Sequence, residues 1–216
     1  MSPDYNKAAI KAAETLVRYN VNKAPVSPLP ILEQMDNVIV TSFDELGSAQ
    51  GYRPCDLALM FGKGQDAVTS IHTDNGRTWY VVAYNSLLPF SIVQHALARE
   101  MGHIVLGHQE GSRENMEEAV CFAHHLLCPR PLIHAIQATA IRFTTDLLAR
   151  LTGVYDQCMA CMRHLPGTAV PSGLNCFVRS QFMPFFVNFF NYYQTVLPQD
   201  GSAVADFGSY MDGYIE

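Results

Sequence analysis

The chain has 216 residues, of which 49% are hydrophobic and 16% are charged, so it is long enough and apolar enough to bury a core. Its formal net charge of −6 argues against direct binding to nucleic acid, which needs a basic surface, and against anionic membranes. The N-terminal stretch has no apolar signal segment, no apolar run is long enough to span a membrane, and the six cysteines suggest reduced thiols. We therefore expect a cytoplasmic protein.

The first part of the chain predicts one helix followed by a small sheet. Residues 4–19 have the periodicity of an amphipathic helix, and the proline-rich stretch 23–30 ends it. Asp74, Asn75 and Gly76 fit a hairpin turn because Asn-Gly tolerates positive φ. Short runs rich in β-branched or aromatic residues predict strands at residues 37–43, 56–61, 67–73 and 77–85. Together these signals predict a small, mostly antiparallel sheet.

After Pro89 the pattern becomes helical. Residues 90–108 place apolar side chains along one helix face, and Gly111 and Ser112 are suited to end this helix and to cap the next. The next helix covers about residues 113–127 and ends before Pro129. Sheet signals before residue 86 and helical signals after it predict an α+β fold.

The segments 144–151 and 154–165 form a helix-turn-helix pattern. Its second helix offers only Arg163 and His164 as cations, so packing explains it better than DNA recognition. Cys158 and Cys161 form a CxxC pair without a second pair at zinc-site spacing. Small core residues on a helix are the simpler interpretation of this pair, and its role stays open.

The aromatic segment 182–193 has too many large rings to remain in water. It is most simply part of the core, packed against the helical half, and a homodimer or partner surface is the alternative. We expect residues 1–165 to form one domain and residues 166–216 to form an aromatic-rich extension packed on it.

The stretch HALAREMGHIVLGH, residues 95–108, differs by one letter from a zinc-peptidase helix. In an HExxH motif two histidines on one helix face bind zinc, and the glutamate activates the bound water. Glu100 and His103 match this pattern, but Arg99 replaces the first histidine. A guanidinium has no lone pair for zinc, and its charge repels the ion. His95 is eight residues from His103, about 12 Å along the helix axis, which is too far to share one metal.

The helix that follows contains the phrase EEAVCFAHHLLCP. A tight loop between two antiparallel helices would bring Glu118 opposite His103, so Glu118 has a geometric reason to be a ligand. Cys121 and His125 follow on the face of Glu118 and could supply replacement ligands if the helices shifted. Otherwise His124 and His125 are ordinary polar positions near a helix end.

Together, YVVAYNSLLPFSIVQHALAREMGHIVLGH and EEAVCFAHHLLCP resemble the ImmA/IrrE family of zinc metallo-endopeptidases, and the resemblance extends over residues 5–165. It implies a zincin-like fold, a zinc site and limited proteolysis of a regulatory protein, often a DNA-binding repressor of a phage or mobile element. By motif position Glu100 matches the general base, and His103 and Glu118 match zinc ligands. Arg99 stands in place of the other ligand, and His108 matches a trailing histidine whose role is open.

Three functions compete. The favoured one is a degenerate family member that keeps the fold and the pocket, has lost zinc hydrolysis and binds a protein partner. An active metallo-endopeptidase with an altered ligand set is the alternative, and a DNA-binding regulator is a distant third. The favoured function predicts little zinc in the protein, with Arg99 turned into the vacated pocket and paired with Glu118, so that the ion pair holds the two motif helices together.

Overall fold

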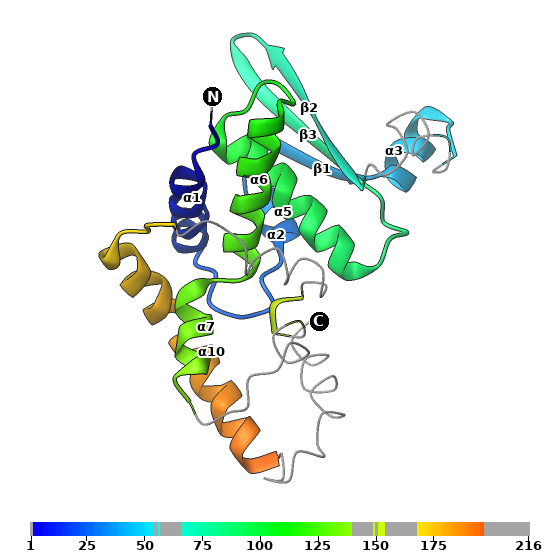
Figure 1. Cartoon of the computed structure of the whole chain (residues 1–216). Helices are drawn as coiled ribbons and strands as arrows, with labels where there is room; N and C mark the ends of the chain where they lie inside the picture. The colour runs from blue at the N-terminus through cyan, green and yellow to red at the C-terminus, as the bar shows by residue number, and fades with distance from the viewer. Residues whose placement is uncertain are drawn as a thin grey trace.

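A computed structural model describes residues 2–53, 56, 66–139, 149, 151–153 and 168–196. Within these residues the chain is an α+β protein with seven helices and one three-stranded sheet (Figure 1). No described helix is long and apolar enough to cross a membrane. The strand expected at 56–61, nearly all of the helix-turn-helix pattern at 144–165, and the pair Cys158 and Cys161 lie outside the described residues.

The sheet has the strand order β1 (Val38–Ser42), β3 (Arg77–Tyr84), β2 (Ala67–Asp74). The predicted hairpin is confirmed: β2 and β3 are antiparallel, and both Asn75 and Gly76 have positive φ, at 49° and 76°. β1, however, runs parallel to β3, so the sheet is mixed rather than mostly antiparallel. A parallel pair needs a crossover, and helix α3 (Phe43–Gln50) begins it directly after β1, with a capping box between Ser42 and Glu45.

Three helices of the first half begin and end close to the predicted residues, and the short α2 (Pro28–Glu33), in the proline-rich stretch, was not predicted. The three predicted helices are α1 (Tyr5–Arg18), α5 (Phe90–Leu106) and α6 (Arg113–Leu127). The side chain of Ser112 accepts a hydrogen bond from the Asn115 N–H and caps α6, as expected. α5 ends earlier than expected, because Gly107 adopts the left-handed conformation with φ 76° and turns the chain.

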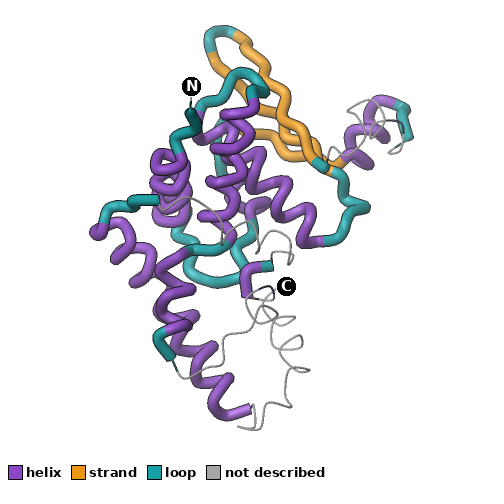
Figure 2. Tube along the Cα trace, viewed as in Figure 1, coloured by secondary structure: helices purple, strands orange, loops and turns teal. Residues whose placement is uncertain are grey.

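α5 lies between the sheet and the other helices, so it forms the centre of the molecule (Figure 2). It contacts β2 and β3 on one side and α6 and α1 on the other. α5 and α6 approach closely at Gly102, where an added Cβ would lie 3.0 Å from the Ala119 carbonyl oxygen. Leu97, Met101 and Phe122 are fully buried between these elements. This close packing fixes the relative position of the two motif helices.

The described part of the C-terminal region consists of α7 (Arg130–Gln137) and α10 (Ser172–Val196). Phe182, Phe185 and Phe189 of α10 are buried in the same core as α1, α5 and α6. The Gln181 amide donates to the Leu16 and Val21 carbonyl oxygens at 2.8 and 2.7 Å, which ties α10 to the end of α1. These aromatic side chains pack within the chain, and a homodimer through 182–193 stays a prediction.

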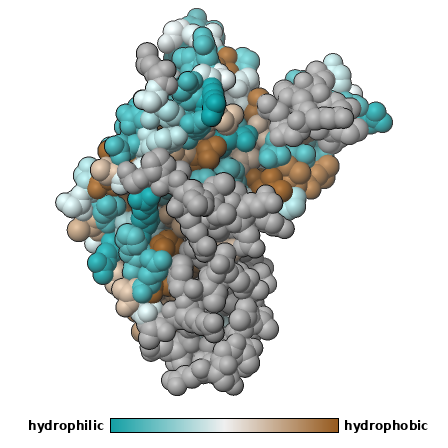
Figure 3. Space-filling model, in the orientation of Figure 1, coloured by the Kyte–Doolittle hydropathy of each residue, from teal (hydrophilic) through white to brown (hydrophobic). Residues whose placement is uncertain are grey.

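Figure 3 shows several small apolar areas, coloured brown, on the visible face. Leu87 before α5 and Phe90 at its start are 75% and 54% exposed. Isolated exposed side chains of this kind are common on protein surfaces.

Candidate functional site

Arg99 and Glu100 form an ion pair on the side of α5 that faces β2. The Nη2 and Nε atoms of Arg99 donate to Glu100 Oε1 at 2.9 and 3.2 Å, and Nη2 also lies 3.4 Å from the Ala67 carbonyl oxygen. The other carboxylate oxygen of Glu100 accepts a hydrogen bond from Thr69 of β2 at 2.8 Å. The side chains of Arg99 and Glu100 are only 18% and 8% exposed. Both oxygens of Glu100 are therefore engaged inside the protein.

A second polar chain links the end of α5 to α6. His103 Nδ1 lies 3.0 Å from His108 Nδ1, and His108 Nε2 lies 3.2 Å from Glu118 Oε2. The other oxygen of Glu118 accepts the backbone N–H of Asp4 at 2.8 Å. If His108 donates from Nε2 to the carboxylate, its Nδ1 is the acceptor in the neutral ring, and His103 must donate from Nδ1. That assignment leaves Nε2 of His103 with its lone pair.

Burial, together with the nearby His108 and Arg99, lowers the pKa of His103 to about 4. His103 is therefore neutral near pH 7, which agrees with a ring that donates one hydrogen bond and keeps one lone pair. A cationic Arg99 beside it favours this neutral form. Burial is the main cause of this shift, and Arg99 adds to it.

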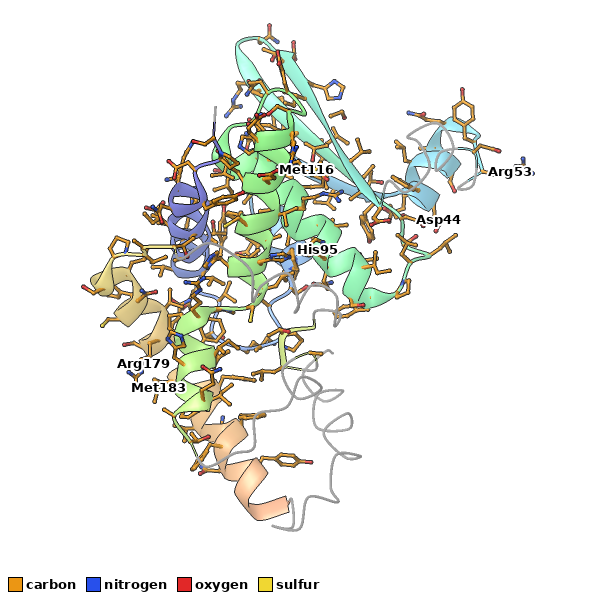
Figure 4. All side chains as sticks on the ribbon, viewed as in Figure 1. Asp44, Arg53, His95, Met116, Arg179 and Met183 are labelled. Carbon is orange, nitrogen blue, oxygen red and sulfur yellow. The ribbon has the colours of Figure 1, made fainter. Side chains whose placement is uncertain are left out.

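Arg99, Glu100, His103 and His108 line one cavity of about 200 Å³ between β2 and α5. β2 contributes Thr69 and Ile71 to its wall, and Met116 of α6, labelled in Figure 4, lies at its edge. Glu118 is outside the lining and reaches the cavity through His108. The structure therefore brings Arg99, Glu100 and His103 together and holds Glu118 one residue behind them.

The expected ion pair between Arg99 and Glu118 is wrong. Arg99 pairs with its neighbour Glu100 and turns toward the Ala67 carbonyl oxygen of β2, while Glu118 is already satisfied by His108 and by the Asp4 N–H. The Arg99 pair consequently stays within α5. Glu118 of α6 instead contacts His108, in the turn that follows α5.

His108 is the residue whose role the sequence left open. The left-handed turn at Gly107 reverses the chain after α5, so that His108 folds back onto His103. The Gly-His pair that follows the motif was the signal for this arrangement, because glycine favours positive φ at the end of a helix.

The suggested replacement ligands do not join the site. The Cys121 thiol lies 3.7 Å from the Tyr5 carbonyl oxygen, and burial raises its pKa to about 12, so it stays protonated. His125 Nε2 lies 3.1 Å from the Thr168 hydroxyl. These two side chains are engaged by α1 and by the segment before α10, away from Arg99.

A further histidine pair lies on the same two helices, between His95, labelled in Figure 4, and His124. Their Nε2 atoms are 3.3 Å apart. His124 and His125 are only 3% and 7% exposed, so the expectation of ordinary polar positions near a helix end is wrong. Within the described residues, His124 Nδ1 and Gln94 Oε1 are buried without a hydrogen-bond partner.

The residues at the motif do not fit a family-type zinc centre. Catalytic zinc usually has three protein ligands, but Arg99 cannot ligate a cation, and His108 holds the Glu118 carboxylate. Across the described part of the chain, no three His, Cys, Asp or Glu side chains are grouped so that they could hold a metal ion. No reaction step through zinc follows from this arrangement.

Comparisons with known proteins find no matching protein-family model, curated protein or solved structure. The resemblance to ImmA/IrrE peptidases therefore rests on the two sequence motifs.

Proposed function

We propose that this chain is a metallopeptidase-like protein that has exchanged its metal centre for an ion pair and that binds a protein partner at the cleft between β2 and α5. The partner class implied by the resemblance is a regulatory protein of the repressor type. The ancestral chemistry would be proteolysis, and the present function is recognition.

The observation that carries this proposal is the state of Glu100. A general base must offer a free oxygen to the water that it activates. One oxygen of Glu100 accepts two hydrogen bonds from Arg99, at 2.9 and 3.2 Å, and the other accepts one from Thr69 at 2.8 Å. A single substitution, arginine for histidine at position 99, therefore has two effects. It removes a metal ligand, and its guanidinium engages an oxygen of the general base Glu100.

The edge of the sheet supports a role in protein binding. Within the described residues β2 pairs only with β3, and its residues from Ser70 to Asp74 are exposed. An edge strand offers unpaired backbone groups to a partner segment that adds as a further strand. Because Thr69 and Ile71 of β2 also line the cavity, a segment on this edge would lie beside Arg99 and His103.

Metal analysis tests the loss of the zinc centre. Protein purified without chelator from zinc-supplemented medium is expected to hold little zinc, whereas Arg99→His should hold close to one ion per chain, since His103 keeps a lone pair on Nε2. Arg77→His, on the exposed end of β3, is the matched control and should leave the zinc content unchanged. Stoichiometric zinc in the unsubstituted protein that is lost in His103→Ala would overturn the proposal.

Substitutions on the two edges of the sheet test the partner surface. Ile71 on β2 and Ile39 on β1 are 37% and 51% exposed, so a lysine is tolerated at either position. Ile71→Lys is expected to abolish co-purification with a repressor-type protein, and Ile39→Lys, at the opposite edge, should retain it. Equal binding by both variants would remove the β2 edge from the proposal.

A further inference from the structure

A second and larger cavity, of about 550 Å³, lies where α1, α7 and α10 meet. It is reached from the C-terminal end of α6, through His125 and Pro129, whereas the Arg99 cavity lies near the other end of that helix. Its volume is within the range typical of small-molecule sites. The partner cleft proposed above does not include any of its residues.

The walls of this cavity come from helix faces at regular spacing. Ala9, Ala13 and Leu16 of α1 form an apolar floor of mostly small side chains, which leaves the space open. Asn175, Cys176 and Arg179 line it from α10. The small floor and the two helical walls produce a pocket with an apolar interior.

Hydrogen bonds hold these walls in place. Thr168 contacts His125 at 3.1 Å, and the Ala169 N–H donates to Asn6 Oδ1 at 2.8 Å, which fixes the segment before α10 to α6 and α1. Gln181 ties α10 to the end of α1. These hydrogen bonds around the cavity thus join residues that are far apart in the sequence.

The charge of the cavity has one sign. Arg130, His134 and Arg179 line it, and the described lining residues include no Asp or Glu. Neither arginine forms an ion pair with a described residue. The chain as a whole has a net charge of −6, so a cavity lined by two arginines is opposite in sign to the chain. Ser172, at the start of α10, also lines the cavity, and this helix N-terminus adds partial positive charge.

We propose that this cavity binds a small organic anion, with a carboxylate or phosphate head between Arg130 and Arg179 and an apolar body over Ala9 and Ala13. A guanidinium matches either head through paired N–H donors. His125 also lines the cavity, and burial and the nearby Arg130 lower its pKa to about 4, so this ring is neutral near pH 7 and the arginines carry the positive charge.

Cys176 provides a reporter in the cavity, since it is exposed and lines the wall while Cys121 and Cys128 are buried. Alkylation of Cys176 by N-ethylmaleimide, followed by peptide mass spectrometry, is measured against increasing octanoate or hexyl phosphate. Either anion is expected to slow alkylation in a saturable manner, and the more effective one identifies the preferred head. 1-Hexanol lacks the anionic head and inorganic phosphate lacks the apolar body, so each should protect far less.

Two matched charge reversals, one in the cavity and one far from it, test the role of Arg179. Arg179→Glu, at an exposed position of α10, should weaken protection about tenfold or more, and Arg77→Glu, on the distant hairpin, should change it less than about twofold. Thermal melting checks that each variant is folded, and Arg179→Gln replaces Arg179→Glu if the latter is not. Protection that is absent, that is equal with 1-hexanol or inorganic phosphate, or that is equally affected by both reversals would overturn the proposal.

Discussion

Two histidine pairs lie at α5 and α6: His103 of α5 with His108 of the turn after it, and His95 of α5 with His124 of α6. His103 and His108 line a cavity, and His108 reaches the carboxylate of Glu118. His95 and His124 contact each other, and His124 Nδ1 is buried without a hydrogen-bond partner among the described residues. The first pair belongs to a polar network with access to solvent, and the second is part of the packing.

The difference shows that the nearby carboxylate decides what a histidine pair can do. If His108 donates to Glu118, His103 must donate to His108, and His103 then keeps a lone pair on Nε2. In the other pair, burial is the main cause that lowers the pKa of His95, despite the opposing charge of Asp66, and that lowers the pKa of His124 to about 4, so both rings are neutral near pH 7. The motif pair is therefore the site, and Arg99 determines its chemistry.

The largest expected loss of stability comes from removing the guanidinium of Arg99. Arg99→Ala leaves Glu100, which is 6% exposed, with Thr69 as its only described donor. The free energy of unfolding should fall by about 3 kcal/mol, as measured by urea denaturation. Adding Glu100→Gln should recover part of this loss, because a neutral amide does not need the cation. An unchanged denaturation midpoint in Arg99→Ala would show that the pair contributes nothing.

Glu118→Ala should be the next most destabilising change. It removes the acceptor of both the His108 ring and the Asp4 N–H, which corresponds to about 2 kcal/mol. Glu117→Ala is the matched control, since the Glu117 side chain is 35% exposed against 13% for Glu118, and its loss should be about 1 kcal/mol or less. Equal losses for the two variants would contradict the inward role of Glu118.

Gly102→Ala tests the packing that both histidine pairs share. The added methyl group would meet backbone atoms of Ala119 at 3.0 and 3.1 Å, which cannot move without shifting α6. Overpacking of this kind is destabilising, although alanine's better helix propensity offsets part of it, so the net loss should be about 1 kcal/mol. Gly111→Ala has no atom within 4 Å of the added group and is the control. A more stable Gly102→Ala would mean that the helices are less closely packed.

A smaller effect is expected on the pH dependence of stability, because His124 and His125 are buried as neutral rings. The pKa of His124 and of His125 is lowered to about 4 in the folded chain, below the value of about 6.5 for a free histidine. The unfolded chain therefore binds more protons between these values, and stability should fall as the pH decreases from 7, by under about 1 kcal/mol per histidine down to pH 6. His124→Asn should flatten this dependence, and an identical slope would show that His124 is not buried as a neutral ring.

Much of the fold near the motif was predictable because it depends on local chemistry. Asn75 and Gly76 specify a hairpin, and Ser112 specifies the start of α6. The inability of Arg99 to bind zinc was equally local, since it follows from the guanidinium itself. Parallel pairing of β1 was missed because the strand pattern alone does not give its direction, although the capping box at Ser42 and Glu45 marked the crossover helix.

The partners of the site residues were not predictable, because they depend on elements that pack from elsewhere in the chain. Arg99 turns to β2 rather than to α6, since Ala67 places a carbonyl oxygen within its reach. His124 and His125 are polar by type, but α6 runs into the core near α7 and α10, where both rings are buried. Burial of this kind follows from the tertiary arrangement.

A double-mutant cycle on Arg99 tests most directly whether an ion pair within α5 has replaced the metal centre. Unfolding free energies are measured for Arg99→Ala, Glu100→Gln and Glu118→Gln and for the two doubles that contain Arg99→Ala. The coupling energy between Arg99 and Glu100 should be about 1.5–3 kcal/mol, and that between Arg99 and Glu118 should be within about 0.5 kcal/mol of zero. A strong coupling to Glu118 together with none to Glu100 would contradict the arrangement described for this site.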